Sequence, residues 1–120
     1  MTRPSAAPAI ILVEPQMAEN IGMVARAMLN CGLDDLRLVR PRQRMPHARA
    51  IATASGADRV VNGARVFPST EAAIADLRLV FAATVRERDM TLRVATPRRA
   101  ASEMRASAAA GKGQPGVIFG

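Results

Sequence analysis

AIILVEPQMAENIGMVARAMLNCG, residues 9–32, joins an apolar run to a segment with helical spacing. The run from Ala9 to Glu14 predicts a buried strand, and apolar residues three and four positions apart predict a helix over Ile21–Cys31. Asn20 is expected to cap that helix and Gly32 to end it. Polar residues therefore gather where a strand passes into a helix, which is where open α/β sheets bind ligands.

The rest of the chain continues this alternation, which favours an α/β fold with a parallel sheet flanked by helices. Further strands are expected over Leu36–Val39, over Val60–Val61 or Val66–Phe67, over Leu79–Ala83 and over Pro115–Phe119. Further helices are expected over His47–Ala54, from a Ser69 cap through Leu77, and from Pro97 to Ala110. Because the last strand runs into Gly120, we expect it either to lie at a sheet edge or to belong to a longer domain.

Length and composition are those of one globular domain. With 120 residues, of which 49% are hydrophobic, the chain is expected to form a single domain over residues 1–120. No apolar stretch approaches the roughly 20 residues of a membrane-spanning helix, and the start does not resemble a signal peptide. Cys31 is the single cysteine and is expected to be a small buried side chain. These features favour the reducing cytoplasm.

Positive charge is concentrated in one segment. The net charge is +7, and arginine supplies nearly all of it. Between Leu36 and Ala57 there is no acidic residue, and the arginines there are Arg37, Arg40, Arg42, Arg44 and Arg49. Because a planar guanidinium grips phosphate with two hydrogen bonds, this segment favours a nucleic-acid partner. A solvated basic face and an anionic small ligand are the alternatives.

The motifs that the sequence lacks argue against several chemistries. There is no Gly-x-Gly-x-x-Gly pattern after the first expected strand and no Walker loop, which argues against a dinucleotide or nucleoside triphosphate enzyme. One histidine and one cysteine give no basis for a metal site, and none is expected. His47 lies among arginines and is expected to be a surface or capping group rather than a catalyst.

Two residues of the first corner, Asn20 and Gly22, have both a structural and a functional interpretation. Asn20 is either a helix cap or a ligand group, and Gly22 is either a site of close packing or part of a binding loop. Arg26 follows Gly22 by one helical turn and has no obvious structural role. From residue types alone, both a catalytic and a structural interpretation of this corner stay open.

The stretch from Glu14 to Met28, with Cys31-Gly32-Leu33 after it, resembles the first motif of the SpoU (TrmH-like) branch of the SPOUT RNA methyltransferases. Within that branch it is most similar to the TrmJ type. Three further stretches agree in order. Residues 36–41 resemble the second strand and turn of the family, residues 82–88 the strand and loop that contact S-adenosylmethionine, and residues 116–120 the opening of the second motif.

The resemblance implies the knotted SPOUT methyltransferase fold, incomplete here because the later motifs are not found before Gly120. It implies methylation of a ribose 2′-hydroxyl in tRNA or rRNA, with S-adenosylmethionine as cofactor, no metal, and a homodimer as the assembly. These 120 residues alone are then expected to have little or no activity. A non-catalytic, basic RNA-binding module of the same fold is the alternative.

The resemblance also implies roles for particular residues. Arg26 and Asn20 are the expected catalytic residues. The expected cofactor contacts are Ala83, Thr84, Val85 and Gly120. The expected RNA contacts, which the charge pattern also favours, are Arg37, Arg40, Arg42, Arg44, Arg86 and Arg88.

Overall fold

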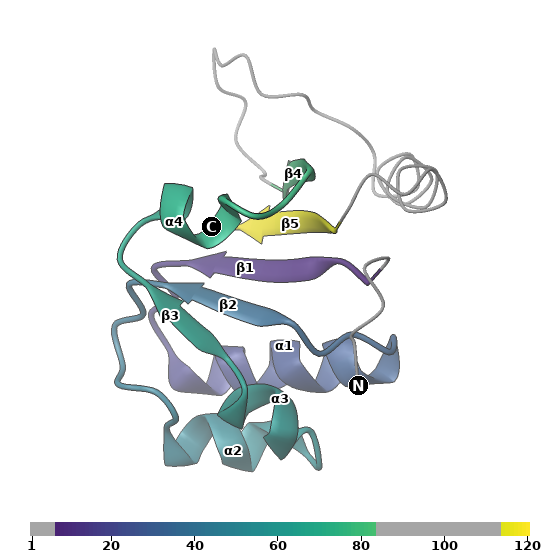
Figure 1. Ribbon diagram of the computed structural model, residues 1–120. Helices are drawn as coiled ribbons and strands as arrows, with labels where there is room; N and C mark the ends of the chain where they lie inside the picture. Colours follow the sequence, from purple (N-terminus) through teal and green to yellow (C-terminus); the bar gives the residue numbers. More distant parts are fainter. Residues whose placement is uncertain (1–6, 84–113) are drawn as a thin grey trace.

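The computed structural model describes residues 7–83 and 114–120 and contains one parallel, five-stranded sheet with helices packed on it (Figure 1). The strands are β1 (Ala9–Val13), β2 (Leu36–Val39), β3 (Arg65–Phe67), β4 (Leu79–Ala83) and β5 (Pro115–Phe119). The helices are α1 (Ala18–Asn30), α2 (Ala48–Ala54), α3 (Asp58–Asn62) and α4 (Thr70–Ile74). The strand order is β3-β2-β1-β5-β4, which confirms the expected parallel sheet with flanking helices.

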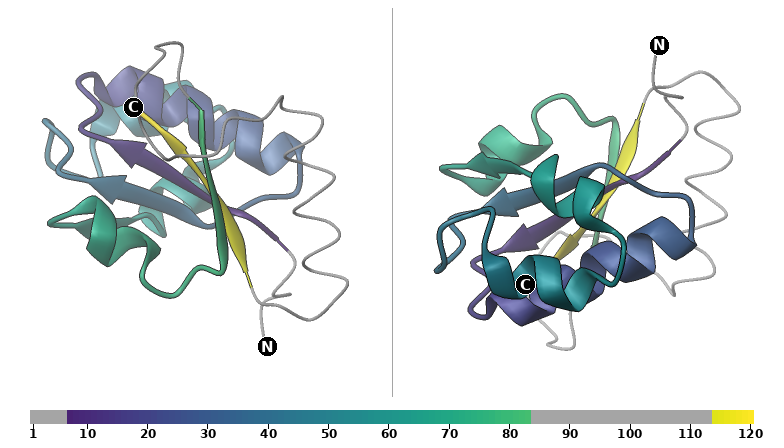
Figure 2. Two further views of the ribbon diagram at one scale, coloured as in Figure 1. Left: turned by 90° about the horizontal axis from the view of Figure 1, so that it is seen from above. Right: turned by 90° about the horizontal axis from the view of Figure 1, so that it is seen from below.

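The central strands send alternate side chains into two separate cores. Ile10 and Leu12 of β1 pack with residues of α1, α2 and α3, whereas Ala9 and Ile11 pack with residues of α4. Figures 1 and 2 show α1, α2 and α3 gathered on one side of the sheet and α4 on the other. This period of two is the usual consequence of a pleated strand that is covered on both faces.

Two of the short helices begin at side-chain caps that the sequence predicted. The His47 ring accepts a hydrogen bond from the Arg49 backbone N–H at 3.1 Å, which confirms its capping role. Ser69 accepts one from the Ala72 N–H, also at 3.1 Å. Such caps satisfy backbone N–H groups that have no partner within the helix. The second of these helices, α4, ends at Ile74, three residues before the predicted Leu77.

The first helix starts earlier than predicted. Met17 occupies the N-cap position, and the Asn20 backbone N–H already bonds the Met17 carbonyl at 3.1 Å. Asn20 therefore lies inside the first turn and is not the cap, so that prediction is wrong. The additional turn buries the Ala18 side chain in the core, which a start at Asn20 would leave out. Gly32 ends the helix as predicted, with a φ of 76°.

The fold decides between two alternatives for the third strand and corrects two other expectations. The third strand lies at Arg65–Phe67, which confirms the Val66–Phe67 alternative, because Val60 and Val61 are buried in α3. Cys31 is exposed, since it sits at the C-cap of α1 beyond the last buried turn. β5 is not an edge strand, because β1 pairs with it on one side and β4 on the other.

Two predicted segments lie outside the described residues and are not tested. They are the part of the cofactor loop that follows Ala83, which the family resemblance implies, and the helix from Pro97 to Ala110.

A glycine sets how closely α1 and α2 approach each other. A Cβ atom built on Gly22 would collide with the Thr53 hydroxyl and with the Ala50 carbonyl oxygen, both of α2. The same Thr53 hydroxyl donates to the Glu19 carbonyl of α1 at 2.8 Å, which ties the two helices together. The close-packing interpretation of Gly22 is confirmed, and the helix that presents Arg26 is thereby fixed against its neighbour.

Replacing Gly22→Ala is expected to lower the free energy of unfolding by about 1 to 3 kcal/mol, because the added methyl group forces α1 and α2 apart. The measurement is urea unfolding of the full-length protein. Met23→Ala, at an exposed neighbour on the same helix, is the control and should change that free energy by about 0.5 kcal/mol or less. Equal stabilities of the Gly22→Ala and Met23→Ala proteins would contradict the tight crossing.

Candidate active site

The carboxyl ends of β1 and β2 leave the sheet together. The Glu14 backbone N–H donates to the Val39 carbonyl at 2.7 Å, and the Arg40 guanidinium donates to the Glu14 carboxylate at 3.1 Å. Both residues have left-handed backbone conformations, with φ of 50° at Glu14 and 45° at Arg40. Such conformations cost on the order of 1 kcal/mol outside glycine and cluster at functional sites. The two loops thus form one paired corner at this edge.

The helix α1 starts from this corner and presents both predicted catalytic residues to solvent. Asn20 lies in its first turn and Arg26 in its third turn, and both are exposed. Arg26 lies six positions after Asn20, so at about 100° per residue their side chains leave the helix roughly 120° apart. The structure places them on one helix but not on one face of it. A ligand that contacts both must therefore wrap around α1 rather than lie along it.

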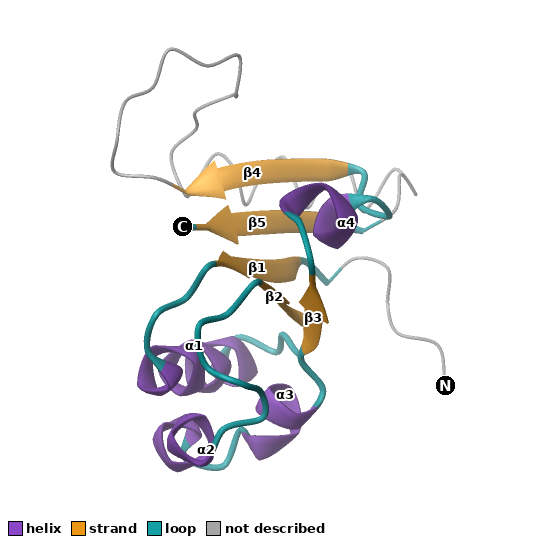
Figure 3. Ribbon diagram, turned by 90° about the vertical axis from the view of Figure 1, so that its left-hand side faces the viewer, coloured by secondary structure: helices purple, strands orange, loops and turns teal. Residues whose placement is uncertain are grey.

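Two of the predicted cofactor contacts meet at the same edge of the sheet. β4 pairs with β5 so that Ala83 lies opposite Phe119, and Gly120 follows directly. Both residues are exposed. A Cβ on Gly120 would lie 3.0 Å from the Val13 Cβ, so the last described residue runs close beside the end of β1 (Figure 3). Thr84 and Val85 lie outside the described residues.

The small side chain of Ala83 and the absence of one at Gly120 fit a cofactor that is bound through backbone groups. Ala83 and Gly120 leave the ends of β4 and β5 uncovered, at the edge where parallel sheets bind their ligands. Among residues 7–83 and 114–120, no group of three or more His, Cys, Asp and Glu side chains could hold a metal ion. In the same part of the chain, none of the helices has the length and apolar character needed to traverse a bilayer.

Three of the predicted RNA contacts lie in the loop after β2. Arg40, Arg42 and Arg44 are exposed there. The loop is held against the start of the first corner, because the Arg42 N–H donates to the Pro15 carbonyl at 3.0 Å. Residues 40–45 and 66–68 line a hollow of about 650 Å³, which we call the basic groove. Arg86 and Arg88 lie outside the described residues.

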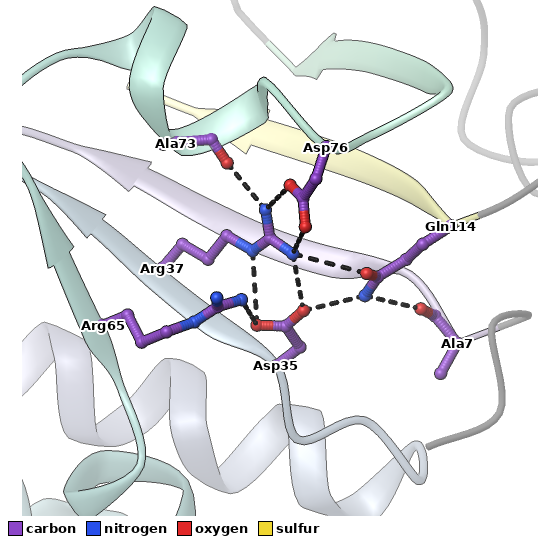
Figure 4. A network of polar contacts seen from close by, with 7 residues as sticks. All are labelled: Ala7, Asp35, Arg37, Arg65, Ala73, Asp76 and Gln114. Carbon is purple, nitrogen blue, oxygen red and sulfur yellow. Dashed lines mark hydrogen bonds and ion pairs between the residues drawn. The ribbon is translucent and has the colours of Figure 1, made fainter. Parts of the chain in front are cut away.

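Arg37, in contrast, is buried, and the prediction that it contacts RNA is wrong. Its relative exposure is 1%. The guanidinium donates to both oxygens of Asp35, at 3.0 and 3.3 Å, to Asp76 at 2.5 Å and to the Ala73 carbonyl at 2.8 Å (Figure 4). It is buried because every residue of β2 is, in a strand covered on both faces.

Gln114 and Arg65 complete this network, which lies at the amino ends of the strands (Figure 4). The Gln114 amide accepts from Arg37 at 3.3 Å and donates to Asp35 at 2.8 Å. Arg65 of β3 donates to the other Asp35 oxygen at 3.2 Å. We call these side chains, with Asp76, the Arg37 network. It joins β2, β3, the segment after α4 and the segment that leads into β5.

The network stabilises the charged forms of its two carboxylates, Asp35 and Asp76. Burial by itself raises the pKa of the Asp35 carboxyl, but hydrogen bonds and the charge of Arg37 outweigh burial and lower that pKa from 3.8 to about 2. The hydrogen bond from Arg37 also lowers the pKa of Asp76. Asp35 and Arg37 are two residues apart in an extended segment, so the sequence could have predicted that their side chains lie on the same face of the sheet. Their partners Asp76 and Gln114 could not be predicted in this way, because they come from distant segments.

A comparison with protein families matches residues 7–111 to the SpoU rRNA Methylase family. The chain belongs to this family. Its fold is that of the SpoU methyltransferases, as the sequence predicted, and membership in a methylase family implies a methyl donor.

Named relatives agree with this assignment. The chain is 35% identical over 111 residues to the tRNA (cytidine/uridine/adenosine-2′-O-)-methyltransferase TrmJ of Pseudomonas aeruginosa, covering 92% of this chain and 42% of the relative. It is 37% identical over 100 residues to the tRNA (cytidine/uridine-2′-O-)-methyltransferase TrmJ of Escherichia coli, covering 83% and 40%.

Solved structures are similar as well. The crystal structure of TrmJ from Z. mobilis superposes with a TM-score of 0.86 at 53% identity, covering 93% of this chain and 48% of that one. A probable methylase family protein from Haemophilus influenzae gives 0.83 at 32% identity, covering 100% and 47%. This SpoU chain thus spans less than half the length of each of these four relatives.

The lowered pKa of Asp35 predicts an acid-sensitive SpoU fold. A depressed carboxyl pKa stabilises the folded state above the unfolded pKa, and that contribution, about 2 kcal/mol, is lost as the pH falls from about 4 through about 2. Asp35→Asn should therefore lower the free energy of unfolding at neutral pH, by about 3 to 5 kcal/mol for a broken buried pair. The difference in free energy of unfolding between Asp35→Asn and the unsubstituted protein should shrink by about 2 kcal/mol as the pH falls toward 2.

Denaturant unfolding at several pH values checks this prediction. Asp58→Asn, at an exposed carboxylate in the first turn of α3, is the matched control and should show no such convergence. A constant difference between Asp35→Asn and the unsubstituted protein across this pH range would contradict the charge of Asp35 in the network.

Proposed function

We propose that this SpoU protein methylates a ribose 2′-hydroxyl in tRNA, with S-adenosylmethionine as the methyl donor. The observation that supports the proposal most directly is the placement of exposed Arg26 on α1, which starts at the sheet edge where Ala83 and Gly120 also lie. The relatives named as tRNA 2′-O-methyltransferases favour tRNA over rRNA as the substrate.

Arg26 acts on charge rather than as a base. Its guanidinium has five hydrogen-bond donors and no acceptor, so it cannot take up the hydroxyl proton. In the proposed complex it grips the phosphate beside the target ribose and stabilises the negative charge that develops on the 2′-oxygen. The 2′-hydroxyl proton passes to that phosphate or to water. Asn20, with one amide oxygen and two N–H donors, holds the ribose from another side of α1.

The cofactor supplies an electrophilic methyl group. Of the four contacts that the family resemblance implies, Ala83 and Gly120 present exposed backbone at the strand ends, and Thr84 and Val85 continue directly from β4. Parallel sheets bind ligands at this edge because the ends of neighbouring strands converge there.

The basic residues hold the RNA. Arg40, Arg42 and Arg44 lie in the loop that leaves the paired corner and line the basic groove, and Arg86 and Arg88 follow Val85 in the sequence. Each phosphate that they neutralise releases counterions, so binding weakens steeply with salt. Arg37 is not part of this surface, because the network encloses it.

The proposed assembly is a homodimer in which each protomer contributes to both sites, as the family resemblance implies. Residues 1–120 then form the first part of a single SpoU domain. The proposed compartment is the cytoplasm, where an exposed lone thiol such as Cys31 stays reduced. A non-catalytic RNA-binding module of the same fold is the alternative, and calorimetric titration of the full-length protein with S-adenosylmethionine separates the two.

Substitution of Arg26 tests the proposed function. In the full-length protein, Arg26→Ala should reduce methyl transfer from labelled S-adenosylmethionine to tRNA by about 10²- to 10³-fold, as for loss of an oxyanion donor. The methyl-transfer rate of Arg26→Lys should lie between those of Arg26→Ala and the unsubstituted protein, because lysine keeps the charge but loses the planar guanidinium. Single-turnover rates at saturating tRNA separate this effect from weaker binding.

Arg59→Ala, at an exposed arginine on α3, is the control and should retain the rate of the unsubstituted protein. Near-normal turnover by Arg26→Ala would defeat the proposed role.

A further inference from the structure

The basic groove has two chemically different walls. Arg40, Arg42 and Arg44 form its charged side, and β3 with the residue after it forms an apolar side. That apolar side consists of Val66, Phe67 and Pro68, with Met45 contributing from the loop. Val66 is 54% exposed, a large fraction for a valine in a strand.

The arginines of the groove are available to a ligand. Among the described residues, Arg42 and Arg44 make no ion pair, and Arg40 pairs only with Glu14. In that pair both side chains are more than half exposed, at 59% and 57%. Exposed ion pairs contribute little to stability, so a phosphate can replace Glu14 at small cost.

A duplex does not match this combination of walls. In a double helix the bases are stacked inside and only phosphates and sugars reach a basic surface, which leaves an apolar wall uncovered. A single-stranded nucleotide offers both parts, because its phosphate meets the arginines while its unstacked base covers the valine, phenylalanine and proline. A volume of about 650 Å³ is of the size that holds one small-molecule ligand.

We propose that the basic groove binds one unpaired nucleotide of the RNA, with its base against Val66 and its phosphate on Arg42. This inference rests on the proposed RNA substrate and adds a base-reading contact apart from the reacting ribose. The groove is tied to the start of the reacting corner through the Arg42 N–H and the Pro15 carbonyl. The nucleotide held there is therefore a near neighbour of the methylated one, and it fixes the register of a single-stranded loop on the enzyme.

The test compares two probes in the full-length protein: a ten-nucleotide uridine RNA and a ribose-phosphate oligomer of the same length without bases. Anisotropy titrations over a range of salt concentrations give the affinity and its salt slope. Val66→Thr keeps the shape of the side chain and exchanges one methyl for a hydroxyl. It should weaken uridine RNA binding about threefold to fourfold, the value of one buried methyl group. It should leave the base-free oligomer and the salt slope unchanged.

Arg42→Gln tests the charged wall. It should weaken binding of both oligomers and reduce the salt slope by about 0.7, the value for one phosphate contact on a single strand. Arg59→Gln, at an exposed arginine on α3 outside the groove, is the matched control and should leave the slope unchanged. Thermal unfolding confirms that each variant is folded. If Val66→Thr does not fold, Pro68→Ser, at an exposed residue of the same wall, replaces it.

Two outcomes would overturn the inference. The first is that Val66→Thr changes the affinities for the two oligomers equally, or changes neither. The second is that the salt slope of binding is the same for Arg42→Gln as for Arg59→Gln. Methyl transfer to tRNA by the unsubstituted protein is measured in parallel. Absence of turnover there counts against the proposed function alone, whereas normal turnover with no Val66 effect counts against the groove alone.

Discussion

A single buried guanidinium holds the two halves of this sheet together. Arg37 extends from β2 to carboxylates at positions 35 and 76 and to the amide of Gln114, so it connects segments almost eighty residues apart. A buried charge that lost these partners would be strongly destabilising. The network therefore fixes where the chain re-enters the sheet, between β1 and β4, and by that the position of Gly120 at the far end of β5.

The molecule separates this stabilising chemistry from its ligand-binding chemistry. Arg37 and Asp35 are buried at the amino ends of the strands, whereas the exposed Arg40, Arg42 and Arg44 lie at the carboxyl ends. Two left-handed residues, Glu14 and Arg40, turn the chain out of the sheet at that second edge. A rigid amino edge and an open carboxyl edge together give loops of defined position that remain free to meet a large polyanion.

Periodicity was enough to predict β1, β2, β4, β5 and α2, because apolar spacing and caps such as His47 are local, but it left two places open for β3. The position of Asn20 was misjudged because burial of Ala18 extends α1 by a turn, a tertiary effect that capping rules do not contain. Arg37 was misassigned because charge alone does not distinguish an exposed arginine from one with buried partners, and Asp76 and Gln114 lie far away in sequence. The apolar wall at Val66 was likewise invisible, since only the fold brings β3 beside the loop after β2.

The insertion of β5 has a consequence for how the protein forms. On a ribosome, the first four strands emerge well before residues 115–119, yet β1 and β4 have no direct partnership with each other. Until the fifth strand arrives, β1 presents an unpaired edge, and β4 has no neighbour among the other described strands. Closure of so distant a pairing is slow, and an open edge invites association with other chains. Nascent copies of this protein should thus depend on prompt completion, or on a chaperone that shields β1 in the interval.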